Sequence, residues 1–291
     1  MNKIYKEMYQ NKLFTLQEAT KIIKDNQICR NNINRLIKEK LITRLKAGIY
    51  YINPLDNQGF YPDIIHIASK LRLDAVISAN SALKVLNLTN KQASTESVVY
   101  LSAKHSSKLR IDKHTYKIIK GFNFGIDKME YHTPYGKFEI KVTDLERTII
   151  DCLRTRSLKG EELLTILKSK QPDAKQLEGK SLEIKQSEVK PVEISFRKII
   201  TYLEKYNMPI LYSKVGLILE LCKTELKIDE SDIDKLKKKL SKKTFYFKER
   251  GIKLIRPRYH YYKEWNIMLP EHLFEMTKTM KPQVAPVIVG K

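Results

Sequence analysis

The sequence predicts an α+β protein with an N-terminal winged helix-turn-helix, an α+β middle domain and an α+β C-terminal domain. Stretches with helical spacing of apolar residues alternate with short strand-like stretches along most of the 291 residues. Pro and Gly interrupt residues 54–62, and a polar stretch of weak periodicity precedes the last part of the chain. We therefore predict domains at residues 1–56, 57–168 and 195–291, with a polar linker at residues 169–194.

Two helices are predicted at the N-terminus, over residues 1–12 and 14–26. The second, FTLQEATKIIKDN, opens with Thr15 as N-cap and Glu18 three residues later, which is the spacing of a capping box. Asn26 is predicted to end this helix in a left-handed conformation.

A helix-turn-helix followed by a hairpin is the prediction for the next stretch, CRNNINRLIKEKLITRLKAGIYYI. A turn of about four residues leads to a helix from about Cys29 to Lys40. The segments ITRL, KAG and IYYI then have the pattern of a strand, a turn and a strand, with Gly48 in the tight bend. In this arrangement the last helix enters the major groove of DNA and the hairpin forms a wing.

The predicted groove-reading helix is amphipathic. Ile33, Leu36 and Ile37 form one apolar stripe, and the opposite side carries Asn, Arg and Lys. Asn can bond adenine with two hydrogen bonds, Arg can bond guanine in the same way, and Lys contacts phosphate or guanine. The predicted DNA-binding residues are Arg30, Asn31, Asn32, Asn34, Arg35 and Lys38 on the helix, and Arg44 and Lys46 on the wing.

A polar helix face has a second interpretation, in which it is only solvated or docks another protein. Three features favour DNA. Asn is a poor helix former, so its excess here needs another reason. The basic wing follows at once, and the net charge of +22 attracts polyanions.

The remaining elements are predicted from periodicity and turn residues. In the middle domain we expect helices at 63–72, 80–88 and 144–156, strands at 75–78, 97–103 and 115–124, and a hairpin at 129–143. In the C-terminal domain we expect helices at 196–206, 213–222 and 229–240, and strands between 244 and 269.

Asp127, Glu139 and Lys141 carry the alternative prediction of a nuclease. Two carboxylates that hold Mg²⁺, with a Lys that helps to activate water, form a metal-dependent nuclease site. Strand alternation places Glu139 and Lys141 on one face. A Glu-x-Lys pattern is common in a Lys-rich chain, so we favour a solvated strand face.

Other candidate sites are interpreted as structural. Arg147 and Asp151 are four residues apart, which is the spacing of an ion pair on a helix surface, and Glu146 lies near a helix N-terminus, where negative charge is favoured. Cys152 and Cys222 are predicted in the core and Cys29 partly exposed. The cysteine spacing fits neither a disulfide framework nor a zinc site. The six His are scattered and the chain has no Gly-rich phosphate loop, so we predict no catalytic site, metal or cofactor.

A third basic feature lies at residues 235–263, where Lys and Arg alternate with aromatic residues. The basic groups can attract a phosphate backbone, and exposed aromatics can stack on unpaired bases. For the aromatics we favour core positions, and for the charges a second nucleic-acid surface, docking to an RNA-bound partner and simple solubility stay open. The residues concerned are Lys237, Lys238, Lys239, Lys242, Lys243, Lys248, Arg250, Arg256 and Arg258.

The location of the chain is predicted from what the sequence lacks. It has no apolar run long enough to span a membrane, and MNKIYKEMYQNK lacks the apolar stretch of a signal peptide. We therefore expect a cytoplasmic protein without a membrane partner.

Five motifs, in order, resemble the AbiEi-type antitoxins of type IV toxin–antitoxin and phage-defence systems. FTLQEATKII and INRLIKEKLITRLKAGIYYI are similar to the N-terminal winged helix of that family. AVISANSALKVLNL resembles its Ser-Ala-Leu helix, and VTDLERTIIDCL its Glu-Arg-Thr block. SKVGLILEL and YYKEWNIMLP resemble its C-terminal Gly-containing helix and Trp-containing strand.

The resemblance implies a function. Such antitoxins act as transcriptional autorepressors that bind repeats in their own promoter through the N-terminal domain. Their partner is a nucleotidyltransferase-like toxin, which is neutralised without a required stable complex through the C-terminal region. A plain transcriptional regulator without a toxin partner is the remaining alternative.

Overall fold

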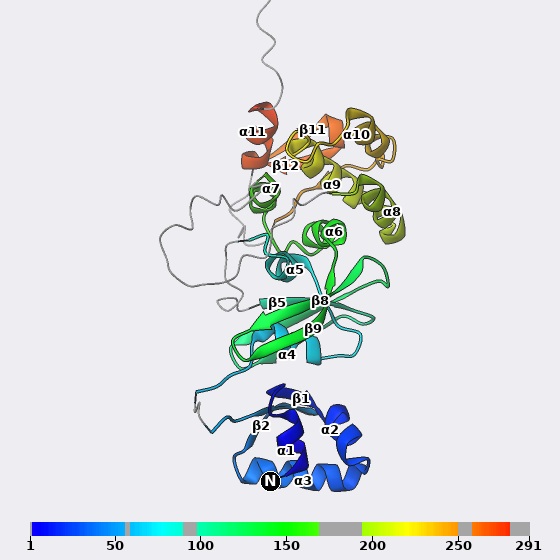
Figure 1. Cartoon of the computed structure of the whole chain (residues 1–291). Coiled ribbons are helices and arrows are strands. Elements are labelled where there is room, and N and C mark those ends of the chain that lie inside the picture. Colours follow the sequence, from blue (N-terminus) through cyan, green and yellow to red (C-terminus); the bar gives the residue numbers. More distant parts are fainter. Residues whose placement is uncertain (1, 56–58, 90–97, 169–193, 250–257, 280–291) are drawn as a thin grey trace, which may run out of the picture. The chain divides into compact units, whose positions relative to one another are not determined.

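The computed structural model describes residues 2–55, 59–89, 98–168, 194–249 and 258–279 (Figure 1). Helices and mixed sheets both occur, which confirms the predicted α+β class. The chain divides into two compact units, Met1–Asp144 and Leu145–Lys291. The boundary predicted at residue 56 lies inside the first unit, and residues 145–168 belong to the second. The predicted linker, apart from residue 194, lies outside the described residues.

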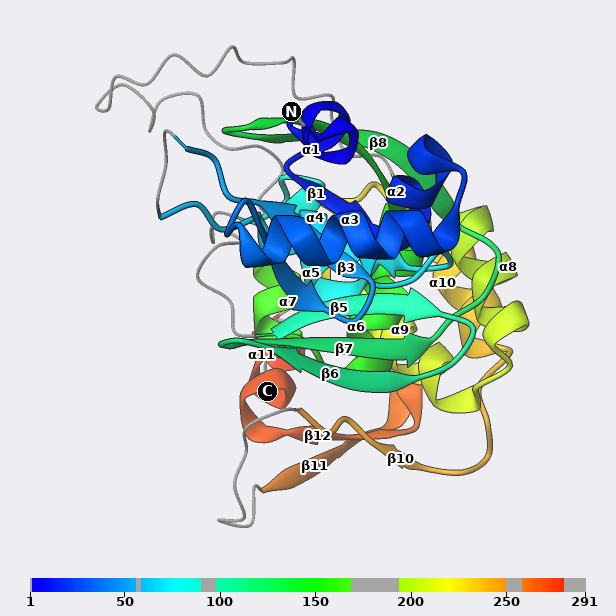
Figure 2. The ribbon, with the colours of Figure 1, turned by 90° about the horizontal axis from the view of Figure 1, so that it is seen from below.

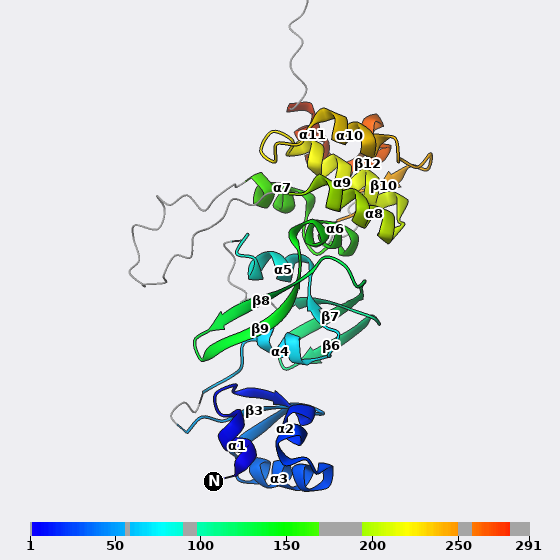
Figure 3. The ribbon, with the colours of Figure 1, turned by 45° about the vertical axis from the view of Figure 1, so that its right-hand side comes forward.

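The first unit begins with a helical layer and a small antiparallel sheet (Figure 3). The sheet has the order β1-β3-β2, with Thr15 opposite Ile49 at one end. The predicted capping box at Thr15 and Glu18 is confirmed. The elements are α1 (Lys3–Met8), β1 (Leu13–Thr15), α2 (Leu16–Ile23), α3 (Asn26–Lys38), β2 (Ile42–Lys46) and β3 (Ile49–Ile52).

The turn between α2 and α3 differs from the prediction. Lys24, not Asn26, takes the left-handed conformation, with φ of 62°. Asp25 then caps α3, because its side chain accepts a hydrogen bond from the Ile28 amide at 2.7 Å. Asn26 is therefore the first residue of α3, and two residues separate the helices instead of four.

Cys29 lies in the core of the helical layer, so its predicted partial exposure is wrong. Because α3 starts three residues earlier than predicted, Cys29 falls inside the helix. There it lies on the same stripe as Ile33 and Leu36, at the i, i+4 and i+7 positions. Ile37, the third member of the predicted stripe, is half-buried at the edge of this core.

A six-stranded mixed sheet completes the first unit, in the order β6-β7-β5-β4-β9-β8. The predicted hairpin is confirmed as β8 and β9, which are joined by a turn at Pro134 and Tyr135. The strand at 107–111 was not predicted, because its mostly polar sequence SKLRI gives little alternation signal. The elements are α4 (Ile64–Lys70), β4 (Val76–Ile77), α5 (Ala79–Val85), β5 (Val98–Ala103), β6 (Ser107–Ile111), β7 (His114–Lys120), β8 (Ile126–Thr133) and β9 (Gly136–Thr143).

The second unit combines helices with a three-stranded sheet in the order β10-β12-β11. The three predicted helices are present as α8, α9 and α10, whereas α7 and α11 were not predicted. The elements are α6 (Leu145–Thr155), α7 (Gly160–Lys168), α8 (Phe196–Tyr206), α9 (Pro209–Leu221), α10 (Glu230–Lys237), β10 (Phe245–Tyr246), β11 (Tyr259–Tyr262), the 3₁₀ helix η3 (Lys263–Trp265), β12 (Ile267–Pro270) and α11 (Glu271–Thr279).

The pair Arg147 and Asp151 is buried, so its predicted place on a helix surface is wrong. Both side chains are fully buried, and Arg147 Nε lies 3.5 Å from Asp151 Oδ2. Asp151 Oδ1 accepts hydrogen bonds from Arg154 and from the Tyr206 hydroxyl, both at 2.8 Å. The four-residue spacing of Arg147 and Asp151 along α6 was predicted correctly. The pair is buried because α8 and α9 pack against α6 and cover the side that carries it.

Candidate nucleic-acid interface

The exposed side of α3 carries a row of polar residues. Gln27, Asn31 and Arg35 follow at i, i+4 and i+8, and Asn34 and Lys38 extend the row. All five are exposed. Figure 2 shows α3 lying across the near side of the N-terminal elements. The row is therefore free to meet a partner along the length of the helix.

The contacts within this row are few and weak. The Gln27 amide donates to Asn31 Oδ1 at 3.3 Å, which leaves the Asn31 amide group as a donor. Arg35 Nε lies 3.8 Å from a Glu39 carboxylate oxygen, and these two side chains are 60% and 50% exposed. An exposed pair of this kind contributes little stability, so a base or phosphate can replace it at low cost.

Two further predicted residues lie on α3. Arg30 is exposed, one turn after the start of the helix. Asn32 is half-buried, and its Oδ1 accepts a hydrogen bond from Asn2 at 3.2 Å. Asn32 is thus held by the N-terminal segment and is the least available member of the predicted set.

The β2–β3 hairpin places its two cations on different faces. Arg44 is opposite Tyr50, which is buried among the helices α1 to α3, so Arg44 projects on the same sheet face as α3. A bulge after Arg44 puts Lys46 opposite Ile49, on the other face. Both cations are exposed. At the tip, Gly48 has φ of 80°, and its carbonyl accepts a hydrogen bond from the Leu16 amide at 2.8 Å.

A shallow depression lies between α2 and the start of α3. Three of its residues, Lys21, Lys24 and Arg30, are basic and exposed. Lys21 and Lys24 were missed by the sequence interpretation, which placed the turn too late. Asp25, a favoured N-cap residue directly before the helix, was the available signal. The depression is lined by Leu16, Gln17, Thr20, Lys21, Lys24, Asn26 and Arg30.

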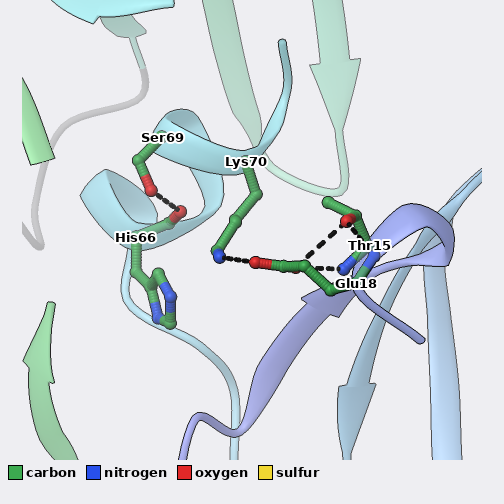
Figure 4. A network of polar contacts seen from close by, with 5 residues as sticks. All are labelled: Thr15, Glu18, His66, Ser69 and Lys70. Carbon is green, nitrogen blue, oxygen red and sulfur yellow. Dashed lines mark hydrogen bonds and ion pairs between the residues drawn. The ribbon is translucent and has the colours of Figure 1, made fainter. Parts of the chain in front are cut away.

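The helix pair is anchored to the six-stranded part of the unit through Glu18. One Glu18 oxygen accepts hydrogen bonds from the amide and hydroxyl of Thr15, at 2.7 and 3.0 Å. The other forms an ion pair with Lys70 of α4 (Figure 4). Burial raises the pKa of Glu18, but the Lys70 and Thr15 hydrogen bonds and the Lys70 charge outweigh it and lower the pKa. Leu13 of β1 and Ile49 of β3 share a hydrophobic core with α4. The strand that leads into α2 is therefore held against the six-stranded part of the unit.

The residues of the predicted nuclease site do not converge. Glu139 lies opposite Glu130 on the hairpin, whereas Asp127 lies opposite Val142 and therefore faces the other side. The Glu139 carboxylate accepts a hydrogen bond from Lys128 at 2.9 Å, and both side chains are about two-thirds exposed. Lys141 Nζ donates to the Leu73 carbonyl at 3.4 Å. Glu139 and Lys141 thus share a charged, solvated strand face.

The residues predicted for a second basic surface fall on 237–248 and on Arg258. Lys238, Lys239, Lys242, Lys243, Lys248 and Arg258 are exposed. Lys237 is half-buried and forms an ion pair with Glu220 at 3.0 Å, and Lys239 reaches Glu204 at 3.5 Å. Arg250 and Arg256 lie outside the described residues.

The aromatic residues of this segment only partly follow the prediction of core positions. Phe247 and Tyr262 are buried as predicted. Tyr246 and Tyr261 are 48% and 51% exposed, so the prediction is wrong for these two. The cause is strand alternation, since neighbours in the short strands β10 and β11 point to opposite faces.

No protein-family model matches the sequence, and no curated protein is similar to it. Within the described residues, no three His, Cys, Asp or Glu side chains are grouped so that they could hold a metal ion. The same residues form no helix that is both long and apolar enough to cross a membrane. The geometry of α3 and the hairpin is therefore the main ground for a functional assignment.

Proposed function

We propose that the protein binds double-stranded DNA through α3 and the β2–β3 hairpin, and represses transcription from its own promoter as an AbiEi-type antitoxin. Its partner in this proposal is a nucleotidyltransferase-like toxin. The observation that carries the proposal is the exposed row of Asn31, Arg35 and Lys38 on α3, with Arg44 of the hairpin on the same face.

The order of elements supports a winged helix-turn-helix. A helix and a strand precede the α2–α3 pair, and an antiparallel hairpin follows it. In such domains the second helix of the pair lies in the major groove and the first crosses the backbone. In this position Lys21 of α2 and Lys24 of the α2–α3 turn face the phosphates beside the groove, and Arg44 meets the backbone at the other end of α3.

The side chains in the row have the chemistry for reading base edges. Asn31 and Asn34 supply amides that match adenine, and Arg35 supplies the fork that matches guanine. Ile28, which is 54% exposed at the N-terminal end of α3, offers an apolar group that suits the methyl group of thymine. Lys38 is suited to phosphate.

The C-terminal motifs behind the family resemblance also fit together in space. Gly216 of α9 lies directly against the Trp265 ring. The Trp265 ring nitrogen donates to Glu220 of the same helix at 2.7 Å. Two motifs more than forty residues apart thus form one contact. This mutual packing supports the resemblance beyond the N-terminal domain.

Binding to promoter DNA tests the site. Arg35→Ala is expected to weaken specific binding by about 1–3 kcal/mol and to relax the preference at one base pair. Arg44→Gln is expected to weaken binding to all sequences and to lower the salt slope by about 0.9. Lys46→Gln should have a smaller effect because Lys46 projects on the other face. Lys108→Gln, an exposed cation of β6, is the matched control. Wild-type affinity in both Arg variants contradicts this site.

Co-expression tests the antitoxin part separately. The toxin candidate is a nucleotidyltransferase-like reading frame beside this gene. It is expected to arrest growth alone and to be harmless when this protein is present. A protein that binds its promoter but protects against no such neighbour is a plain regulator, which is the remaining alternative.

A further inference from the structure

One face of the sheet β10-β12-β11 carries three tyrosines, two of which are exposed. Tyr246 of β10 and Tyr261 of β11 both lie opposite Met268 of the central strand, so the three side chains share one face. Tyr259 lies on this face too, and its ring meets that of Tyr246 edge-on, with centroids 5.1 Å apart. Figure 2 shows the three strands side by side.

The opposite face of the sheet belongs to the core. Ile267 and Leu269 are fully buried there. Tyr262 reaches Glu220 of α9, and His260 stacks on Phe274 of α11 at 4.7 Å. The helices α9 and α11 therefore cover that face, and the tyrosine face points to solvent.

The ring of Tyr261 is held in place although it is half exposed. Its hydroxyl donates to Asn266 Oδ1 at 3.0 Å. Asn266 is fixed in turn by the Thr244 hydroxyl and by the Ser241 carbonyl, both at 2.8 Å. An aromatic ring that is exposed and already oriented loses little conformational freedom when a flat partner stacks on it.

Cations lie at both ends of the tyrosine face. Strand directions place Lys243 and Lys263 at the end where β12 begins, and Lys248 and Arg258 at the end where it finishes. All four are exposed, and within the described residues none of them forms an ion pair. The face thus combines flat apolar rings with positive charge on two sides.

We infer that the tyrosine face, defined by Tyr246, Tyr259, Tyr261 and Met268, binds single-stranded nucleic acid. Unpaired bases stack on Tyr246 and Tyr261, and the phosphates meet Lys243, Lys263, Lys248 and Arg258. Stacking needs a free base face, which a duplex does not offer. The ligand of this surface is therefore single-stranded, whereas the ligand proposed for α3 is double-stranded DNA. The inference does not rest on the proposed repressor function.

The test measures binding of the full-length chain to fluorescein-labelled oligo-dT of about 12 nucleotides, within the site sizes of single-strand binders. The double variant Tyr246→Leu/Tyr261→Leu is expected to bind more weakly by about 30-fold or more, since it removes two stacking rings and each stacked base contributes about 1–3 kcal/mol. The matched double variant Tyr246→Phe/Tyr261→Phe keeps the rings and is expected to keep the affinity. Circular dichroism melts of both variants verify that they are folded.

Two further probes separate stacking from charge. An abasic strand of equal length is expected to bind weakly and equally to the wild type and the Leu variant. Lys248→Gln is expected to reduce the salt slope of oligo-dT binding by about 0.7. Arg35→Ala on α3 should leave oligo-dT affinity unchanged, so failure of the duplex site and failure of this site are distinguishable.

Three results overturn the inference. The first is unchanged oligo-dT binding by a folded Leu variant. The second is an abasic strand that binds as tightly as oligo-dT. The third is a loss of binding to labelled polyglutamate, but not to oligo-dT, in the Leu variant. That result would assign the face to an acidic protein instead.

Discussion

Lys214 is a cation enclosed in the second unit. Its side chain is 3% exposed, and its Nζ donates to the Leu153 carbonyl at 3.3 Å. The Phe247 ring lies 5.2 Å from the same atom. Burial, followed by the charge of Arg156, lowers the pKa of Lys214 to about 8, against the opposing effect of Glu249. Keeping Lys214 charged at neutral pH therefore costs folding free energy.

Lys214→Met is expected to stabilise the second unit by about 1–3 kcal/mol at pH 7. The folded pKa of about 8 lies below the unfolded value of about 10.4, so the unfolded chain binds more protons between these values. The unfolding free energy of the wild type should then rise as the pH increases from about 8 to 10, and the variant should lack this rise.

Urea unfolding followed by the fluorescence of Trp265, the single tryptophan, measures this effect in the second unit. Lys238→Met removes an exposed cation of the same unit and serves as the control. Equal pH profiles for Lys214→Met and the wild type would show that the amine is not desolvated as the structure implies.

At the scale of elements, the contact between α9 and η3 shows how a glycine sets helix packing. Glycine inside a helix normally lowers stability by about 0.5–1 kcal/mol relative to alanine. Gly216 is an exception, because an added Cβ would overlap the fully buried Trp265 ring. The position therefore selects glycine by tertiary contact and against local helix propensity.

Gly216→Ala is expected to destabilise the second unit by about 1–3 kcal/mol, opposite in sign to the usual effect of this change in a helix. Thermal unfolding followed by circular dichroism measures the loss. The same change in a Trp265→Phe background should lower the free energy of unfolding by less, because the smaller ring leaves space for the added methyl group. An equal loss of unfolding free energy in the two backgrounds would show that the effect of Gly216→Ala does not come from the contact with the indole ring.

Over the whole molecule, charge is the dominant property. The chain has 55 Lys and Arg against 33 Asp and Glu, a net charge of +22. Such an excess attracts polyanions without specifying a fold or a sequence. In the proposed function, specific recognition comes from the exposed row on α3, and the remaining charge adds non-specific affinity that depends on salt.

Promoter affinity of the full chain is expected to fall steeply with salt. With about 6–10 phosphate contacts, the loss between about 50 and 200 mM salt is about 10³- to 10⁵-fold. A scrambled duplex of equal length should bind more weakly but lose affinity with a similar slope. Fluorescence anisotropy at several salt concentrations gives both slopes. A promoter slope near zero would be incompatible with binding through the cations of α2, α3 and β2.

The sequence alone determined the α+β class, the Thr15–Glu18 capping box, the Gly48 turn and the polar row on α3. These features depend on contacts a few residues apart, so spacing and turn chemistry are enough to predict them. Lys24 and Gln27 were not predicted at the candidate interface, because the helix was expected to begin at Cys29, whereas Asp25 caps it and Asn26 is its first residue.

Tertiary structure alone decided what each polar face meets. It buried Arg147 and Asp151 under α8 and α9, separated Asp127 from Glu139 across the β8–β9 hairpin, and left Tyr261 facing solvent. Residue spacing places a side chain on one side of a helix or strand. Burial depends on which distant segment packs there, and no local pattern contains that information.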